Sequence, residues 1–139
     1  MFSINNRFIG NGYPTYIIAE LSANHNQDIE VGKKLILAAK KAGADAIKLQ
    51  TYHPDTITLD CDNEYFKISE GPWVGETLHE LYSRAYTPWE WTVELKKLAN
   101  SLGMDLFSSP FDTTAVDFLE TVGVPAYKIA SFEITDHII

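Results

Sequence analysis

The sequence predicts an α/β fold built on a parallel sheet, and two observations carry this prediction. Three times, a stretch with apolar residues at helical spacing ends at a glycine (Gly43, Gly103 and Gly123), and an apolar run of strand length follows. Glycine is favoured just past a helix end because it accepts the left-handed backbone without a steric penalty. Strands that alternate with helices in this way form parallel sheets with right-handed crossovers.

The first half of the chain supplies a hairpin, two strands and a helix. Within the N-terminal segment 1–14, the Gly-Asn-Gly sequence predicts a turn that closes a small hairpin over residues 7–14. Residues 15–21 predict the first strand. Apolar positions spaced for a helix cover residues 29–42, and residues 43–50 predict the second strand.

A long connection separates this half from the next strand. Residues 51–86 are too many for an ordinary loop between a strand and a helix, and inserts of this size are typically functional. Thr87 to Glu90 predict a capping box, with proline at the first helical position, for the second helix. Residues 103–109 then predict the third strand. Asp112 is expected to cap the third helix, and residues 123–130 predict the fourth strand.

The composition and net charge of the chain exclude several classes of protein. The chain has 139 residues, 45% of them hydrophobic, and a net charge of -8 at pH 7. Such a chain is not disordered, and the absence of a basic run argues against a nucleic-acid partner. It has no apolar stretch long enough to span a membrane and no secretory signal at its start. The single cysteine, Cys61, excludes an internal disulfide and favours the cytoplasm.

Four polar residues are predicted to gather near the carboxyl ends of the strands, where parallel α/β folds place their sites. In the second strand, Lys48 and Gln50 alternate with branched apolar residues, so they face away from the helices. Lys128 stands at the same offset from its glycine as Lys48 does, and Glu20 ends the first strand. Two inward lysines call for an anion such as a phosphate or a carboxylate. The alternative is a structural salt bridge between Lys48 and Glu20.

Weaker candidates lie in the loops that follow the strands. Ser108 and Ser109 join the third strand to a helix start, where hydroxyls and free amides suit phosphate binding, although serine is also an ordinary capping residue. Ser131 and Glu133 follow the fourth strand and are either ligand contacts or solvated loop residues. Residues 24–26, Asn-His-Asn, are either a substrate contact or a turn.

Four motifs at these positions resemble the sialic acid synthase family, and together they cover nearly the whole chain: Ala19–Asn26, Ala38–Tyr52, Phe107–Asp112 and Val124–Thr135. Within the family, the sequence is most similar to the synthases of pseudaminic acid, on the evidence of ELSANH and of residues 51–60 and 85–91. Synthases of N-acetylneuraminate or legionaminate are the alternative. An unrelated phosphate-binding barrel would require four accidental matches.

The resemblance implies a TIM (β/α)8 barrel, of which residues 15–139 form the first four βα units. In the family, a second half-barrel and a C-terminal antifreeze-protein-like domain follow, both absent from this chain, and the active form is a domain-swapped dimer. The implied enzyme is a transferase. It condenses phosphoenolpyruvate with an open-chain N-acylated amino sugar, here a 2,4-diacetamido-2,4,6-trideoxy hexose, and releases phosphate.

The resemblance also assigns roles to the candidate residues. Phosphoenolpyruvate-binding residues would be Lys48, Ser109, Lys128 and Ser131; for the third strand the glycine offset favours Ser108, whereas the family match favours Ser109. Glu20 and Gln50 would contact the sugar, and Glu20 would be a catalytic residue together with Glu133. Glu133 would lie near a divalent metal (Mn, Mg or Co) and act on the attacking water, while the two metal-binding histidines are expected beyond residue 139.

Two expectations follow for residues 1–139 alone. With an incomplete metal site, this polypeptide should be inactive as a synthase. A half-barrel also leaves strand edges unpaired, so the chain should self-associate. The competing hypothesis of another class is a non-catalytic module that only binds phosphoenolpyruvate or only associates through its open sheet.

Overall fold

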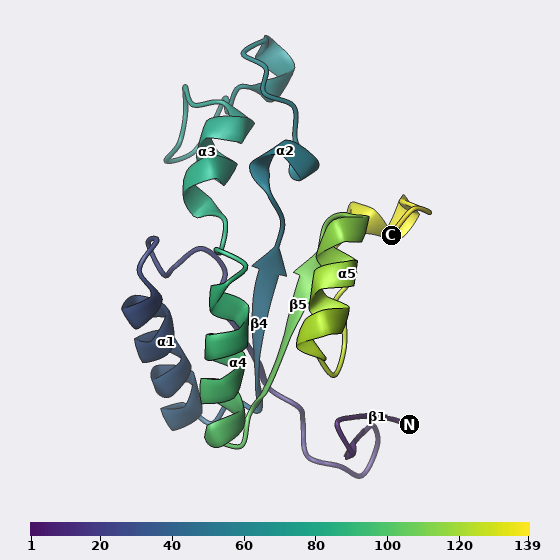
Figure 1. Ribbon diagram of the computed structural model, residues 1–139. Coiled ribbons are helices and arrows are strands. Elements are labelled where there is room, and N and C mark those ends of the chain that lie inside the picture. Colours follow the sequence, from purple (N-terminus) through teal and green to yellow (C-terminus); the bar gives the residue numbers. More distant parts are fainter.

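The computed structural model describes all residues from 1 to 139 and confirms an α/β chain with a parallel sheet (Figure 1). None of the helices combines the length and the apolar composition that a membrane span requires. In chain order the elements are β1 (Phe2–Ile4), β2 (Arg7–Ile9), β3 (Ile18–Glu20), α1 (Ile29–Lys41), β4 (Ala46–Thr51), α2 (Pro54–Ile57), the 3-10 helix η1 (Glu64–Phe66), α3 (Leu78–Ala85), α4 (Trp91–Ser101), β5 (Asp105–Pro110), α5 (Thr113–Val122) and the 3-10 helix η2 (Glu133–Thr135).

The main sheet contains β3, β4 and β5 in that order, and both pairings are parallel. The first strand is shorter than the predicted 15–21. In this register Glu20 pairs with Lys48, and Gln50 pairs with Ser109. Residues paired in a parallel ladder point to the same side of the sheet, so the register fixes which side chains can meet.

The hydrophobic core lies between the sheet and the helices. Ile47 and Leu49 of β4 pack there with Ile36 of α1, Leu95 of α4 and Leu106 of β5, all at most 1% exposed. Burying one such side chain contributes about 1.5–3 kcal/mol. Truncating Leu95 to alanine would therefore cost about 2–5 kcal/mol, because the well-packed neighbours leave a cavity behind.

The structure confirms two of the predicted helix boundaries and contradicts a third. Asp112 caps α5, its Oδ1 accepting from the amide of Ala115 at 2.9 Å, and Gly123 ends that helix with a left-handed φ of 67°. The capping box predicted at Thr87 is wrong, because α4 begins only at Trp91. The hydroxyl of Thr87 instead lies 3.0 Å from His25 Nε2.

The predicted fourth strand is reduced to a single parallel bridge between Ser108 and Tyr127. One backbone hydrogen bond accompanies it, from the amide of Lys128 to the carbonyl of Ser108 at 3.1 Å. This segment pairs on one side only, and Pro125 has no amide hydrogen to donate. A continuous ladder therefore does not form there.

An N-terminal hairpin does form, but not where the sequence predicts it. β1 and β2 pair antiparallel around a turn at Asn5 and Asn6, whose left-handed φ angles of 46° and 67° suit a two-residue hairpin loop. The predicted Gly-Asn-Gly turn follows the hairpin instead. Arg7 forms an ion pair with Asp45, which docks the hairpin at the amino end of the main sheet (Figure 1).

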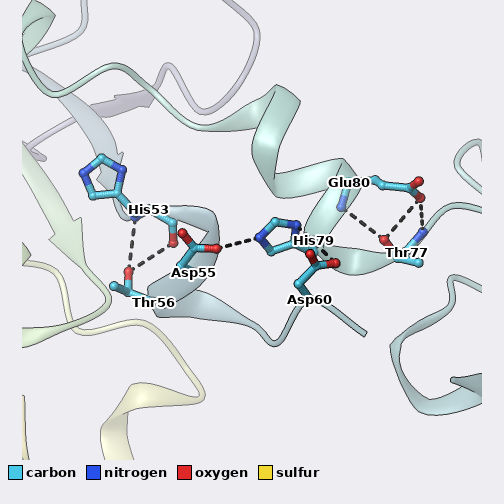
Figure 2. Close-up of polar contacts among 7 residues, drawn as sticks. All are labelled: His53, Asp55, Thr56, Asp60, Thr77, His79 and Glu80. Atoms are coloured by element: carbon cyan, nitrogen blue, oxygen red, sulfur yellow. Dashed lines mark hydrogen bonds and ion pairs between the residues drawn. The ribbon is translucent and has the colours of Figure 1, made fainter. Parts of the chain in front are cut away.

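The insert after β4 rises from the opposite end of the sheet, where the arrowheads of β4 and β5 point (Figure 1). It is not an open loop, since it contains α2, η1 and α3. Figure 2 shows His79 of α3 between two aspartates, with Nε2 2.8 Å from Asp55 and Nδ1 3.8 Å from Asp60. Thr77 and Glu80 form the capping box that starts α3. The bond from His79 to Asp55 joins α3 to α2.

Candidate functional site

Lys48 is the central charge of the candidate site. It lies in the middle of β4 on the face opposite the hydrophobic core, and its side chain is only 9% exposed. Its Nζ lies 3.2 Å from Oε1 of Glu20, whose side chain is 61% exposed at the end of β3. The predicted alternation is therefore correct, and the ion pair considered as the alternative interpretation is present. An ammonium carries three donors, so one carboxylate leaves capacity for another anion.

Gln50 and Ser109 are paired on the same face of the sheet as Lys48, two residues closer to the carboxyl ends of the strands. Ser109 is 1% exposed, and its Oγ has no hydrogen-bond partner. A buried hydroxyl without a partner is uncommon and costly, which points to a group that pairs with it when a ligand is bound.

Ser108 has a different environment although it is equally buried. It is in register with Leu49, so its side chain lies on the core side, and its Oγ is 2.7 Å from Oγ1 of Thr51. The hydroxyl is thus already satisfied. Of the two serines that the sequence left as rivals, Ser109 is the one that lies on the lysine face with an unpaired hydroxyl.

Lys128 extends this face across the edge of β5. Tyr127 bridges Ser108 and directs its hydroxyl to Glu120 of α5, on the helix side. Because Tyr127 lies on the helix side, alternation along the extended backbone predicts that the next residue, Lys128, faces the side of Ser109 and Gln50. No hydrogen bond or ion pair joins the Lys128 side chain to Lys48 or Glu20. The ion pair of Lys48 with Glu20 therefore does not include Lys128.

Ser131 and Glu133 lie beyond this segment. Ser131 is exposed, and its side chain forms no hydrogen bond with the lysine face. Glu133 begins η2 and is half-buried, and its Oε2 is buried without a hydrogen-bond partner. An orphaned carboxylate oxygen suits a metal ligand, yet no group of three or more His, Cys, Asp or Glu side chains could hold a metal ion. The residues of this chain therefore do not fit a complete metal site by themselves.

The loop between β3 and α1 contains the Asn-His-Asn sequence. His25 is 1% exposed, and both of its ring nitrogens are hydrogen-bonded. It is therefore a buried residue that stabilises the loop and not an exposed turn residue. Asn24 donates from Nδ2 to the carbonyl of Leu21 at 3.2 Å.

The same loop forms one wall of a cavity of about 510 Å³, and the insert forms the other, with Trp73 and Arg84 among the lining residues. Sequence reasoning did not assign either residue to a site. The pattern predicts an insert but not which of its side chains return to the first loop.

An aromatic pair lies at the carboxyl ends of β4 and β5. Tyr52 follows β4, is 4% exposed and meets Phe111, which follows β5, edge-to-face at 5.7 Å. Burial, together with the nearby Tyr82, raises the pKa of Tyr52 to about 12. Its hydroxyl stays protonated and neutral at physiological pH, so Tyr52 does not act as a base.

The arrangement can bind an anion and hold a second polar reactant beside it. A buried lysine, a second lysine on the same face and an unpaired buried hydroxyl supply positive charge and donors in a place of low dielectric, where they act more strongly than in water. Gln50 and Glu20 add an amide and a carboxylate at the rim of the same face.

Comparisons with known proteins point to one family. The model of the NeuB family matches residues 35–139. The chain is 50% identical to the pseudaminic acid synthase of Helicobacter pylori over 123 residues, which cover 88% of this chain and 36% of that protein. It is 38% identical to the N,N'-diacetyllegionaminic acid synthase of Legionella pneumophila over 91% of this chain and 36% of that protein.

A solved structure shows the same fold. The N-acetylneuraminic acid synthetase of Leptospira borgpetersenii superposes with a TM-score of 0.80 at 27% identity, over 97% of this chain and 42% of that one. The chain thus spans little more than a third of the length of the curated relatives it matches.

Proposed function

The chain belongs to the NeuB family, and from that premise we propose that it carries the phosphoenolpyruvate-binding face of a nonulosonic acid synthase. The single observation that supports this most is the buried Ser109 hydroxyl, which has no partner and lies on the same sheet face as the buried Lys48. A phosphate or carboxylate oxygen placed there would satisfy the hydroxyl and offset the lysine charge.

The proposed reaction joins phosphoenolpyruvate to an open-chain N-acylated amino sugar. The methylene carbon of phosphoenolpyruvate attacks the sugar aldehyde, and a carbon–carbon bond forms while the aldehyde oxygen takes up a proton. Water adds to the resulting oxocarbenium-like carbon, and phosphate leaves by cleavage of the carbon–oxygen bond. Lys48 and Lys128 hold the phosphate and carboxylate, an electrostatic preorganisation that needs no rearrangement during the reaction.

The remaining residues act on the sugar and on water. Ser109 and Ser131 donate hydroxyl hydrogens to phosphoenolpyruvate, and Gln50 and Glu20 contact the sugar. Glu133 receives the proton of the attacking water as a general base. When a divalent metal is bound, it polarises a carbonyl as a Lewis acid. Residues 1–139 offer Glu133 as one ligand, so the other ligands would come from elsewhere in the whole protein.

The sugar is proposed to be a 2,4-diacetamido-2,4,6-trideoxy hexose of the pseudaminic acid type. The identity of 50% to a pseudaminic acid synthase, against 38% to a legionaminic acid synthase, supports this branch. The reaction is proposed to take place in the cytoplasm, because a reducing compartment would preserve the free thiol of Cys61. A dimer is proposed because the edge strand β3 exposes Ile17 and Ile18 near its start.

Calorimetric titration of the chain with phosphoenolpyruvate tests the proposal. The wild-type chain should bind, and Lys48→Met together with Ser109→Ala should abolish binding. Product analysis of the whole protein with each candidate amino sugar then separates the pseudaminic acid branch from the other two. Absence of binding by a folded wild-type chain would leave only a structural module that associates through its sheet.

A further inference from the structure

His25 is a buried titratable group that the proposed reaction does not use. Its Nδ1 accepts a hydrogen bond from the amide of Gln27 at 3.1 Å, so the ring proton must reside on Nε2. That nitrogen lies 3.0 Å from Oγ1 of Thr87, to which it donates. Trp91 packs edge-on against the ring at 5.4 Å. The surroundings thus select the neutral ring in one tautomer.

The loop that His25 holds is strained. Between β3 and α1, Ser22, Asn26 and Gln27 all have left-handed φ angles, of 48°, 49° and 56°. Such a conformation disfavours residues other than glycine and persists only where the surroundings impose it.

The loop is tied to the end of the insert at two places. His25 bonds Thr87, and the Gln27 side-chain amide donates to the backbone carbonyls of Arg84, at 3.1 Å, and Tyr86. Arg84 lies in the last turn of α3, and Tyr86 and Thr87 directly follow that helix. Without the His25 ring, the strained conformation loses the acceptor for the Gln27 amide and one of its two ties.

The strained loop begins directly after the candidate site. The amide of Leu21 donates to the carbonyl of Lys48 at 3.1 Å, and the left-handed turn at Ser22 follows at once. Because the Glu20 side chain is 61% exposed, packing does not fix it. The strand register directs Glu20 toward Lys48, and the loop continues the backbone from the end of β3 where this register is held.

We propose that His25 is a positioning residue: through its bonds to Gln27 and Thr87 it holds the β3–α1 loop against the end of the insert and thereby orients Glu20 toward Lys48 and the bound sugar. This role rests on the proposed function for its catalytic consequence, although the orientation of Glu20 can be observed without any reaction.

The arrangement is sensitive to acid. Burial lowers the pKa of His25 from its ordinary value of 6.5, and the groups packed against the ring (Gln27, Gly32, Thr87 and Trp91) carry no charge. A protonated ring would point a second N–H at the Gln27 amide, donor against donor. The native loop is therefore fully stable above pH 6.5 and weakens as the pH falls from there toward the lowered pKa of the folded state.

The first test is spectroscopic and uses the chain itself. Nitrogen chemical shifts should report a neutral His25 ring with the proton on Nε2 at pH 7. His25→Ala should shift the amide signals of residues 20–27 and the carboxyl signal of Glu20, while those of Ser109 and Lys128 stay in place. His25→Gln, whose amide can donate toward Thr87, should restore most of the wild-type signals. His79→Gln in the insert is the matched control.

The second test measures kinetics in the whole protein. A small misplacement of a substrate-orienting group can cost about a hundredfold in rate. His25→Ala should lower kcat or raise KM for the sugar, leave the affinity for phosphoenolpyruvate unchanged, and be rescued by His25→Gln. Unmoved Glu20 signals, or equal loss of sugar and phosphoenolpyruvate binding, would overturn the positioning role. If the wild-type protein forms no product, the proposed synthase function fails, while the Glu20 signals still decide the role of His25.

Discussion

Lys48 and Glu20 face each other across neighbouring strands with Nζ and Oε1 3.2 Å apart, yet only the lysine is buried. The carboxylate keeps most of its water and the ammonium keeps little. Burial of a charge is costly unless partners compensate for it, and one exposed carboxylate is a weak partner. This asymmetry makes the lysine the group whose replacement tells a ligand-binding site from a structural ion pair.

Lys48→Met is expected to weaken phosphoenolpyruvate binding without destabilising the fold. Loss of a hydrogen bond to a charged group costs about 1.5–3 kcal/mol, which corresponds to a fall in affinity of about tenfold to hundredfold. Stability should hold, because methionine removes the buried charge at a similar side-chain length and the remaining Glu20 is solvated. Titration calorimetry and urea unfolding measure the two effects. Lys34→Met, on an exposed position of α1, is the control. A drop in stability with unchanged affinity would assign Lys48 to the salt bridge alone.

The two adjacent serines of β5 should separate binding from stability. Ser109→Ala removes a buried hydroxyl that has no partner, so it should lower phosphoenolpyruvate affinity and leave stability equal or higher. Ser108→Ala removes the bond to Thr51 and leaves that hydroxyl buried, which should cost about 1–3 kcal/mol with unchanged affinity. The same titration and unfolding experiments apply. If both variants lose affinity equally, the serines are not distinguished by their faces.

The N-terminal hairpin should detach in acid. The hydrogen bond from Arg7 holds the pKa of Asp45 below its ordinary value of 3.8, with a smaller contribution from the amide of Ile17. The carboxylate therefore stabilises docking at neutral pH, and this contribution is lost as the pH falls below that ordinary value toward the lowered one. Limited acid proteolysis should then cut residues 10–15 faster. Asp45→Asn should speed cleavage already at neutral pH, whereas Asp62→Asn, an exposed control, should not.

Two glycines should respond in opposite directions to alanine. Gly32 lies within α1, and an added Cβ would meet Leu95 and His25 at 3.7 and 3.8 Å, ordinary contact distances. Gly32→Ala should therefore stabilise the chain by about 0.5–1 kcal/mol, through the lower entropy of its unfolded state. Gly123 has a φ of 67°, so Gly123→Ala should destabilise by about 1–2 kcal/mol. Denaturation midpoints measure both, and equal signs would contradict the prediction.

Local patterns predicted much of the fold. Apolar spacing and glycine stops located α1 and α5 to within a residue or two, and strand alternation placed Lys48 and Gln50 opposite the core. These features depend on neighbours close in sequence, which a pattern records. The capping box predicted at Thr87 does not form, because the Thr87 hydroxyl bonds His25, which is 62 residues away in the sequence.

Long-range partners also explain what else the sequence left open. The predicted fourth strand forms only one bridge, because β5 is its only neighbour. The alternation of residues in the sequence does not reveal how many neighbours a strand has. The hairpin turn formed at Asn5 and Asn6 although the Gly-Asn-Gly sequence offered a competing turn nearby. Residue types alone also did not reveal that Ser109 is unsatisfied and Ser108 satisfied, because that difference depends on Thr51, 57 residues away from Ser108.

The length of the insert has a consequence for the rate of folding. β4 and β5 are adjacent in the sheet, but Thr51 and Ser108 at their carboxyl ends are 57 residues apart in the chain. The chain must close this loop before the hydrogen bonds between β4 and β5 can form and offset the conformational entropy that closure costs. Parallel pairings of this kind form slowly. Lys48 and Ser109 therefore come together late, and a shortened insert would bring β4 and β5 together sooner.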